Sequence, residues 1–296
     1  MKSTTPSTPA HHPVVIATLW MTGALLSFMI MALGGRELAG KMSIFEILFF
    51  RSGVGLPIIV VLLWLTGWGQ ISLANLKLHF ARNIAHFCGQ YGWFYAVGVI
   101  PLAQVFAIEF TQPIWVAVIA TLMLGERMTR ARVTAIVLGI IGVLLILRPG
   151  LAAINPGSLA VLGAAFLFSF AIVFTRKLAQ RESALAILFY MSMIQLPLVL
   201  GPTLANWVTP TAAMWPWALL VGITGMSAHY CMARAITLVD ATVVAPMDFL
   251  RVPLIAQVGY VYYGEAFDWF VLIGAAIMLA GNFINIRAER ARVPRP

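Results

Sequence analysis

The segment LGERMTRARVTAIVLGIIGVLLILRPG, residues 124–150, returns in altered form as YGEAFDWFVLIGAAIMLAGNFINI, residues 263–286. Each copy places a Gly-Glu pair before a long apolar stretch that carries a glycine at a matching position. A shift of 139 residues superimposes Gly125 on Gly264 and Gly142 on Gly281. A fixed period of this kind predicts an internal duplication.

The duplication extends over most of the chain. The shift of 139 pairs Glu109 with Asp248, and a shift of 140 pairs Pro57 with Pro197. The gaps are small and fall mostly between apolar segments. We therefore expect a polar, disordered leader, two repeats and a basic tail, over residues 1–12, 13–150, 151–288 and 289–296.

The composition predicts an all-α integral membrane protein. The chain is 61% hydrophobic and only 10% charged, which leaves too little polar surface to cover a water-soluble fold. A bilayer core about 30 Å thick takes roughly 20 apolar residues per helix. Ten such segments are predicted, at residues 13–34, 43–65, 77–98, 102–124, 131–148, 157–178, 184–206, 214–236, 241–263 and 267–287.

The basic residues predict the orientation of these segments. With ten spans, fourteen Lys and Arg residues fall on the side of the termini, and only Arg36, Lys41 and Arg148 on the other. Basic residues gather on the cytoplasmic side, so both termini are expected there. Because each repeat has an odd number of spans, the second repeat must be inverted relative to the first. Inverted repeats that enclose a midplane site are a recurrent transporter plan, although a duplicated structural bundle is the alternative.

The two Gly-Glu segments, each followed by a glycine-bearing helix, resemble the EamA type of the drug/metabolite transporter superfamily. The resemblance covers essentially the whole chain. The second copy lacks the basic residues that follow Glu126 in the first, which an inverted topology explains. The resemblance implies ten helices around a central substrate cavity and transport by alternating access. Similarity to bacterial exporters of aromatic amino acids implies that the small-molecule substrate is an amino acid.

The third span carries a polar stripe. The residues Asn83, His86, Gln90 and Trp93 recur at three and four residues, so they share one face of a helix. Such a face is expected to line a cavity and bind a polar ligand. His229, in the eighth span, corresponds to Gln90 or His86 depending on the register. Histidines that only hydrogen-bond neighbouring helices remain the structural alternative.

The fourth and ninth spans contain ionisable residues that would be costly in contact with lipid. Glu109 and Gln112 correspond through the repeat to Asp248 and Arg251. Asp248 and Arg251 could form a local ion pair, and Arg51 could reach Glu109, in which case all of these residues are structural. In the alternative, a carboxylate changes its protonation during transport, or an arginine holds a substrate carboxylate.

Other chemistry finds no support in the sequence. There is no Walker motif, no metal-ligand cluster and no recognisable hydrolase set, so neither an enzyme nor a cofactor is predicted. The net charge of +9 is dispersed between apolar spans, which argues against nucleic acid as a partner. An intramembrane enzyme and a structural partner protein are the alternatives from other classes.

We therefore expect a secondary transporter or facilitator that exports small metabolites, amino acids first, from a bacterial-type inner membrane. The alternative transporter function is export of hydrophobic or cationic drugs, with Glu109 and Asp248 as counter-charges. Partners would be membrane lipid and, for coupling, a proton. Both a monomer and a homodimer are compatible with the sequence.

Overall fold

The computed structural model describes residues 13–125, 128–149, 155–239 and 241–291, and almost all of them are helical. The first repeat contains α1 (Pro13–Leu38), α2 (Ile44–Thr66), the short 3-10 helix η1 (Trp68–Gln70), α3 (Leu76–Val99), α4 (Leu102–Glu109), α5 (Gln112–Leu124) and α6 (Arg130–Leu147). The second contains α7 (Pro156–Leu178), α8 (Ala184–Ala205), α9 (Trp215–Ile236), α10 (Ala241–Phe249), α11 (Arg251–Tyr263) and α12 (Trp269–Arg290). The predicted leader and Glu126 lie outside the described residues.

The helices form ten membrane-crossing segments, which confirms the predicted fold class. The fourth segment is α4 followed by α5, and the ninth is α10 followed by α11. Seven of the ten segments qualify as membrane spans by length and hydropathy alone. Among the described residues, the other three segments, which are α3, α9 and the α10–α11 pair, do not meet this criterion. They carry seven of the nine residues predicted for the site, whereas Glu109 and Gln112 lie in the α4–α5 segment, which does meet it.

Proline explains where the fourth and ninth segments break. A proline has no N–H for the carbonyl four residues earlier, and its ring clashes with that carbonyl. The residue four before Pro113 is Glu109, the last residue of α4. The residue four before Pro253 is Phe249, the last residue of α10. The sequence predicted one continuous segment at residues 102–124 and another at 241–263; the structure has two helices in each.

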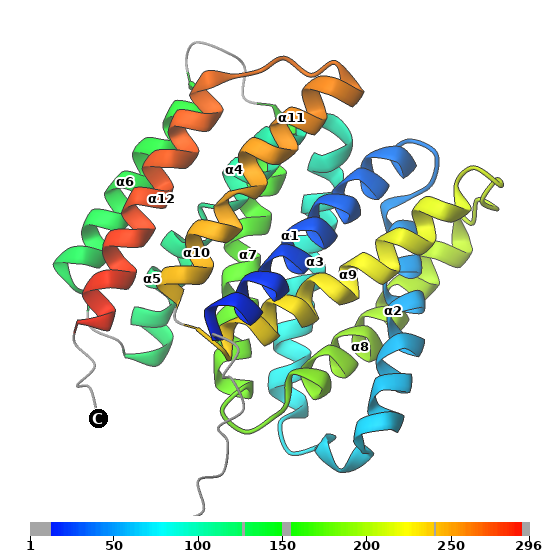
Figure 1. The fold of residues 1–296 in the computed structure, drawn as a ribbon. Helices are drawn as coiled ribbons and strands as arrows, with labels where there is room; N and C mark the ends of the chain where they lie inside the picture. The colour runs from blue at the N-terminus through cyan, green and yellow to red at the C-terminus, as the bar shows by residue number, and fades with distance from the viewer. Residues whose placement is uncertain (1–12, 126–127, 150–154, 240, 292–296) are drawn as a thin grey trace, which may run out of the picture.

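The helix packing is symmetric under exchange of the two repeats. In chain order α1, α2, α3, α4–α5 and α6 correspond to α7, α8, α9, α10–α11 and α12. The extensive α1·α9 contact becomes the α3·α7 contact under this exchange, whereas α2·α8 and α6·α12 each map onto themselves. Figure 1 shows α6 and α12 side by side along one edge of the bundle, with α2 and α8 at the opposite edge. Each repeat therefore packs mainly against the other.

Glycine allows the closest of these contacts. A Cβ atom on Gly142 of α6 would lie 2.6 Å from the carbonyl oxygen of Gly274 in α12, and one on Gly274 would lie 2.6 Å from that of Gly142. The equivalent contact under the repeat exchange is Gly281 against Ala135, where an added Cβ would meet the backbone at 3.2 Å. Small residues that let two helix backbones approach closely are typical of packing in membranes.

We call the end of the bundle where α1 begins and α12 ends the terminus end, and the opposite end the far end; in Figure 1 the terminus end faces down. At the far end α4 packs against α11. Among the described residues, their counterparts α5 and α10 at the terminus end are not a packed pair. The broken segments thus meet in their far halves and diverge in their terminus halves.

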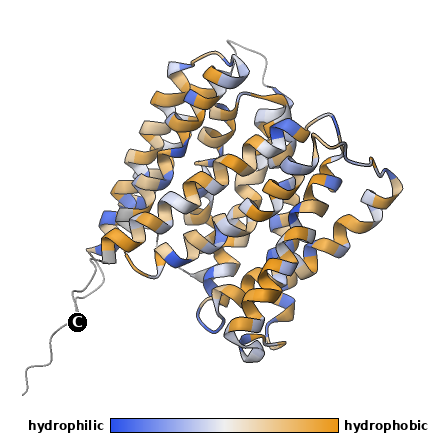
Figure 2. Cartoon of the chain, turned by 45° about the vertical axis from the view of Figure 1, so that its right-hand side comes forward, coloured by the Kyte–Doolittle hydropathy of each residue, from blue (hydrophilic) through white to orange (hydrophobic). Residues whose placement is uncertain are grey.

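Polar contacts also hold the far end together. Glu265, directly after the left-handed Gly264, accepts a hydrogen bond from the N–H of Leu102 (2.9 Å) and pairs with Arg36 at 2.8 Å. Arg148 pairs with Asp268, which lies three residues after Glu265. These contacts join α1, α4, α6 and the α11–α12 connection. Figure 2 shows that hydrophobic residues predominate along the helices, as expected for a surface in contact with lipid.

Candidate functional site

The polar stripe of α3 faces the inside of the bundle. The side chains of Asn83, His86, Gln90 and Trp93 lie on one helix face and are all at most 6% exposed. That face is buried because α3 packs along α7 and against α8. An apolar helix with one buried polar face must satisfy its polar groups from other helices or from a ligand.

Trp93 connects the stripe to the two broken segments. Its indole N–H donates to Glu109 Oε2 at 2.7 Å. Glu109 also faces Arg251, with 3.9 Å between Oε1 and Nη1. Arg251 Nη2 in turn pairs with Asp248 Oδ2 at 2.7 Å. The structure therefore brings Trp93, Glu109, Asp248 and Arg251 together where α4 and α10 end.

Of the two ion pairs considered from the sequence, Asp248 with Arg251 is present. The pair between Arg51 and Glu109 does not form among the described residues, because Arg251 of α11 occupies that position beside Glu109. Glu109 and Asp248 share Arg251, so this cluster has two carboxylates for one guanidinium.

Aromatic rings enclose the Arg251 guanidinium. Its carbon lies 4.6 Å from the ring centre of Phe28, 5.0 Å from that of Phe110 and 5.4 Å from that of Phe106. Phe110 also stacks on Phe249, with ring centres 3.9 Å apart and planes inclined by 18°. These two phenylalanines are repeat partners, so they place the pseudosymmetry axis between the breaks.

A small cavity opens beside this stack on the terminus side, between the diverging α5 and α10. Its volume is about 70 Å³, and besides the charged cluster it is lined by Gln112, Pro113, Ala245 and Asn282. Such a cavity has room for water and not for a metabolite. Gln112 was predicted for the site and borders this cavity, while its backbone oxygen accepts from Ser169.

Gln195 of α8 forms hydrogen bonds to the residues in the middle of the polar stripe. Its amide nitrogen lies 3.0 Å from His86 Nδ1. Its oxygen accepts from the Gln90 amide at 2.8 Å in the Gln90 orientation that satisfies both neighbours. In that orientation the Gln90 oxygen accepts from the Arg51 guanidinium at 2.7 to 3.0 Å. Asn83 donates to the Tyr190 carbonyl at 3.3 Å, which ties the stripe to α8 again.

His229 reaches the same region from α9. Its ring centre is 5.4 Å from that of His86 and 5.4 Å from that of Phe28. The two histidines from equivalent helices therefore face each other across the seam between the repeats. All nine residues predicted for the site lie in this seam or at the two helix breaks.

Arg82 corrects one prediction. It is one of the fourteen basic residues that the predicted topology places on the side of the termini, but its side chain is only 5% exposed. Nη1 donates to Asn83 Oδ1 at 2.7 Å, and Nε donates to the Thr175 hydroxyl of α7 at 3.3 Å. The charge therefore lies inside the bundle, because the α3·α7 contact covers this turn of α3.

Gln195 was not among the residues predicted for the site, although it is a lone amide in an otherwise apolar helix. That isolation was the signal available. Arg82 carried a signal as well, because it adjoins Asn83 at the start of the stripe. His79, one turn before Asn83, pairs with Glu182 at 2.6 Å between fully or nearly fully buried side chains. This pair joins α3 to the α7–α8 turn and lies toward the terminus end.

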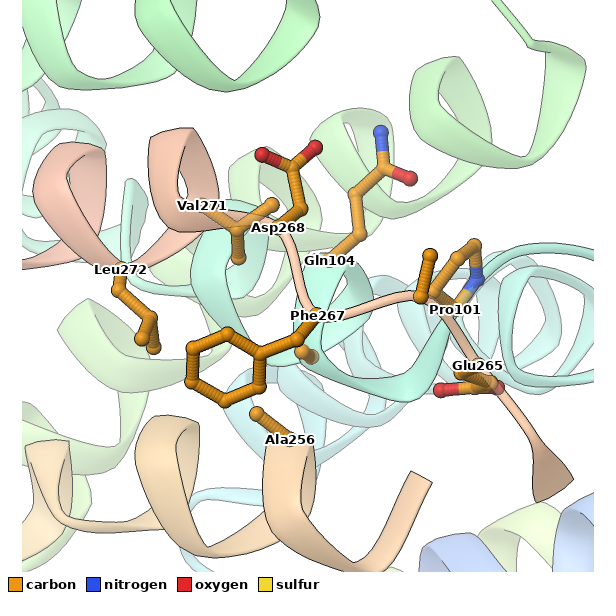
Figure 3. Close-up of a pocket in the computed structure, with 10 residues that line it drawn as sticks. Pro101, Gln104, Ala256, Glu265, Phe267, Asp268, Val271 and Leu272 are labelled. Atoms are coloured by element: carbon orange, nitrogen blue, oxygen red, sulfur yellow. The ribbon is translucent and has the colours of Figure 1, made fainter. Parts of the chain in front are cut away.

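A second cavity, of about 110 Å³, lies at the far end (Figure 3). Glu265 and Asp268 from the α11–α12 connection line it, together with Gln104 of α4 and Phe267. Gln104 donates to Ser158 at 3.2 Å, which also joins α7 to this end of the bundle. No group of three or more His, Cys, Asp or Glu side chains among the described residues is arranged to hold a metal ion.

Comparison with known proteins gives a family match to each repeat. Residues 15–148 and residues 155–287 both match the EamA-like transporter family. The chain is 25% identical over 273 residues to an S-adenosylmethionine uptake transporter of Rickettsia prowazekii, with 92% of each chain covered. It is 26% identical over 285 residues to a riboflavin transporter of Rhizobium johnstonii, covering 95% of this chain and 94% of that one.

A third relative is a pseudopaline exporter of Pseudomonas aeruginosa, 24% identical over 269 residues and covering 90% of this chain and 94% of that one. A solved crystal structure is similar in fold, with a TM-score of 0.66 at 19% identity, over 94% of this chain and 99% of the other.

Proposed function

Because the chain belongs to the EamA-like transporter family of the drug/metabolite transporter superfamily, we propose that it exports amino acids by alternating access. It is a multi-pass membrane transporter of small molecules with bacterial relatives, and those relatives are named as transporters, not as enzymes. The amino acid substrate, the export direction and the mechanism are our proposal.

The observation that carries the proposal is the meeting of Trp93, Glu109, Asp248 and Arg251 at the paired helix breaks. Broken helices at the seam of two inverted repeats present free helix ends and polar groups near the membrane midplane, where transporters bind substrate. The stripe residues Asn83, His86 and Gln90, with His229 and Gln112, would complete the substrate site. The two repeats, residues 13–150 and 151–288, would rock about it.

An amino acid suits the charges of this region. Its ammonium group matches the excess of carboxylate around Arg251, and its carboxylate matches the buried arginines near Gln90. S-adenosylmethionine, named in one group of relatives, is itself an α-amino acid. The relatives include both an uptake transporter and an exporter, so export is the part of the proposal that rests on the sequence resemblance alone.

The alternative is export of hydrophobic or cationic drugs. Carboxylates and aromatic rings at the helix breaks favour it, because this combination binds organic cations. The rings of Phe28, Phe106 and Phe110 already surround the protein's own Arg251, however. A cationic substrate would have to displace that guanidinium and approach further buried arginines.

We further propose that the protein lies in a bacterial inner membrane with both termini in the cytoplasm. The terminus end would then be cytoplasmic, and the packed far end would be closed to the periplasm. Glu109 is the candidate for proton coupling. Its carboxylate has the Trp93 indole as hydrogen-bond partner and shares Arg251 with Asp248. Both a monomer and a homodimer are compatible with these features.

Counterflow by the purified protein tests the proposed function. Proteoliposomes loaded with one unlabelled L-amino acid are expected to accumulate its labelled form from the outside. Aromatic amino acids should compete with this uptake. Arg251→Gln should abolish the exchange, whereas the surface variant Glu289→Gln should retain it. Competition by quaternary ammonium compounds without competition by amino acids would favour the drug alternative. Absence of flux for every solute would contradict a transport function of this chain alone.

A further inference from the structure

Two arginines in the bundle interior have no acidic partner within the described part of the chain. Arg51 of α2 is 3% exposed and Arg82 of α3 is 5% exposed. No carboxylate lies within 4.0 Å of either guanidinium among residues 13–125, 128–149, 155–239 and 241–291. Arg251 differs, because it has Glu109 and Asp248. A buried charge without a counter-charge is costly, so these two require another explanation.

Amides and a hydroxyl are the partners that these arginines do have. Arg51 bonds to the Gln90 oxygen, and Arg82 bonds to the Asn83 oxygen and to the Thr175 hydroxyl. Gln195 connects the two ends, since it bonds to Gln90 and has a longer contact of 3.5 Å with Asn83. A guanidinium carries five N–H donors, so at both ends of this chain of hydrogen bonds there are fewer acceptor oxygens than N–H donors.

The two guanidinium groups belong to one buried network, because Gln195 contacts both Gln90, which binds Arg51, and Asn83, which binds Arg82. Like charges in one buried network repel each other. The region therefore has two uncompensated positive charges, with neutral amides and imidazoles between them. Forked guanidinium donors match the geometry of a carboxylate.

The opposite charge lies one helical turn away on the same stripe. Gln90, which holds Arg51, precedes Trp93, which holds Glu109, by three residues. Three residues correspond to a rise of roughly 4.5 Å. Arg51 and Glu109 are therefore bound by residues on adjacent turns of α3, while Arg82 is bound by Asn83, seven residues before Gln90. A positive pole thus precedes a negative pole along the same helix face.

We propose that Arg51 and Arg82 form the carboxylate-binding pole of the substrate site, opposite an ammonium-binding pole at Glu109 and Asp248. This inference rests on the proposed transport of amino acids and specifies how they are recognised. In the absence of substrate, Gln90 and Asn83 take up part of the donor capacity. On binding, the substrate carboxylate supplies the negative charge that the described part of the protein does not.

Ligand binding to the purified protein in detergent tests the proposal, read as the rise in unfolding temperature with ligand concentration. The probes are L-phenylalanine, 3-phenylpropanoate without the ammonium group, and phenethylamine without the carboxylate. Both carboxylate probes are expected to stabilise the wild-type protein. Arg51→Gln and Arg82→Gln should each weaken their binding by about tenfold or more, because a charge-assisted hydrogen bond is lost. Binding of phenethylamine should be unchanged.

A control variant and a measurement without ligand separate recognition from folding. Arg176→Gln, next to Thr175 but exposed, should leave the binding of all three probes unchanged. Without ligand, Arg51→Gln and Arg82→Gln should unfold at the wild-type temperature or above it, since each relieves a repulsion. If the arginines were structural, both variants would instead unfold at lower temperature.

Undiminished binding of the carboxylate probes to both variants would overturn the proposal, and so would the failure of both carboxylate probes to stabilise the wild-type protein. The outcomes for the proposed function are distinct. If counterflow of amino acids is absent but 3-phenylpropanoate binds through Arg51 and Arg82, amino acid transport fails and the anion site stands. If amino acids are exchanged normally by Arg51→Gln and Arg82→Gln, the anion site fails and amino acid transport stands.

Discussion

At the scale of single residues, the account depends on Glu109. Its carboxylate accepts from the Trp93 indole and faces Arg251, which is closer to Asp248. Arg251 therefore remains paired if Glu109 becomes neutral. A carboxylate that can lose its charge without leaving a buried cation unpaired is suited to exchange a proton during transport.

We expect Glu109→Gln to fold and to lose the pH dependence of exchange. The amide oxygen can still accept from Trp93, and Arg251 keeps Asp248, so the unfolding free energy should change by about 1 kcal/mol or less. The side chain no longer titrates, so counterflow measured in proteoliposomes across a pH series should become flat. The wild-type protein should show a pH-dependent rate in the same series.

The matched control is Glu289→Gln at the end of α12, which removes one ion-pair partner of Arg132. That variant should keep the wild-type pH profile. If Glu109→Gln also kept it, Glu109 would have no proton role, and the cluster at the helix breaks would be structural.

The sequence predicted the members of this cluster better than their partners. Helical spacing placed Gln90 and Trp93 on one face, and the repeat paired Glu109 with Asp248. It proposed Arg51 as the arginine that could reach Glu109, whereas the structure has Arg251 there, because this contact depends on how distant helices pack. Arg82 was misplaced for a related reason. A basic residue near the start of a span is usually interfacial, and only the packing of α7 over α3 buries this one.

At the scale of helices, composition located the ten segments within a few residues of their bounds, because long apolar stretches must be helical in lipid. It did not divide the fourth and ninth segments. Proline within a membrane helix produces anything from a kink to a break, depending on what satisfies the freed carbonyl. In this fold Phe110 and Phe249 stack between the breaks, which is a tertiary contact that no local pattern contains.

The α6·α12 contact gives a prediction about helix packing. Gly142→Ala should lower the unfolding temperature in detergent, because its Cβ would lie 2.6 Å from the Gly274 carbonyl, and relieving the overlap costs about 1–3 kcal/mol. Gly281→Ala should have a smaller effect, since its nearest contacts are 3.0 to 3.2 Å.

Gly163 of α7 is the control for helix propensity. Its added Cβ would meet nothing within 4 Å, so Gly163→Ala should be neutral or stabilising by up to about 1 kcal/mol. Equal effects of Gly142→Ala and Gly163→Ala would contradict the close packing of α6 and α12.

At the scale of the whole molecule, the two ends of the bundle differ although the repeats are alike. The far end has the α4·α11 contact, Glu265, which joins Arg36 to the N-terminus of α4, and a cavity of about 110 Å³ beside them. The terminus end has α5 and α10 apart, with a small cavity between them. In the opposite state of an alternating-access cycle, the repeats would exchange these arrangements.

A pair of distances measured by pulsed electron paramagnetic resonance tests this claim most directly. Spin labels at Met123 and Thr237 span the terminus end, and labels at Tyr262 and Val99, which the shift of 139 relates to the first two positions exactly or within one residue, span the far end. All four positions are exposed, and the background variant replaces Cys88 and Cys231 with serine. On addition of an amino acid that supports counterflow, the distance at the terminus end should shorten while that at the far end lengthens. Two distances that stay fixed, or that change in the same direction, would contradict alternating access by inverted repeats.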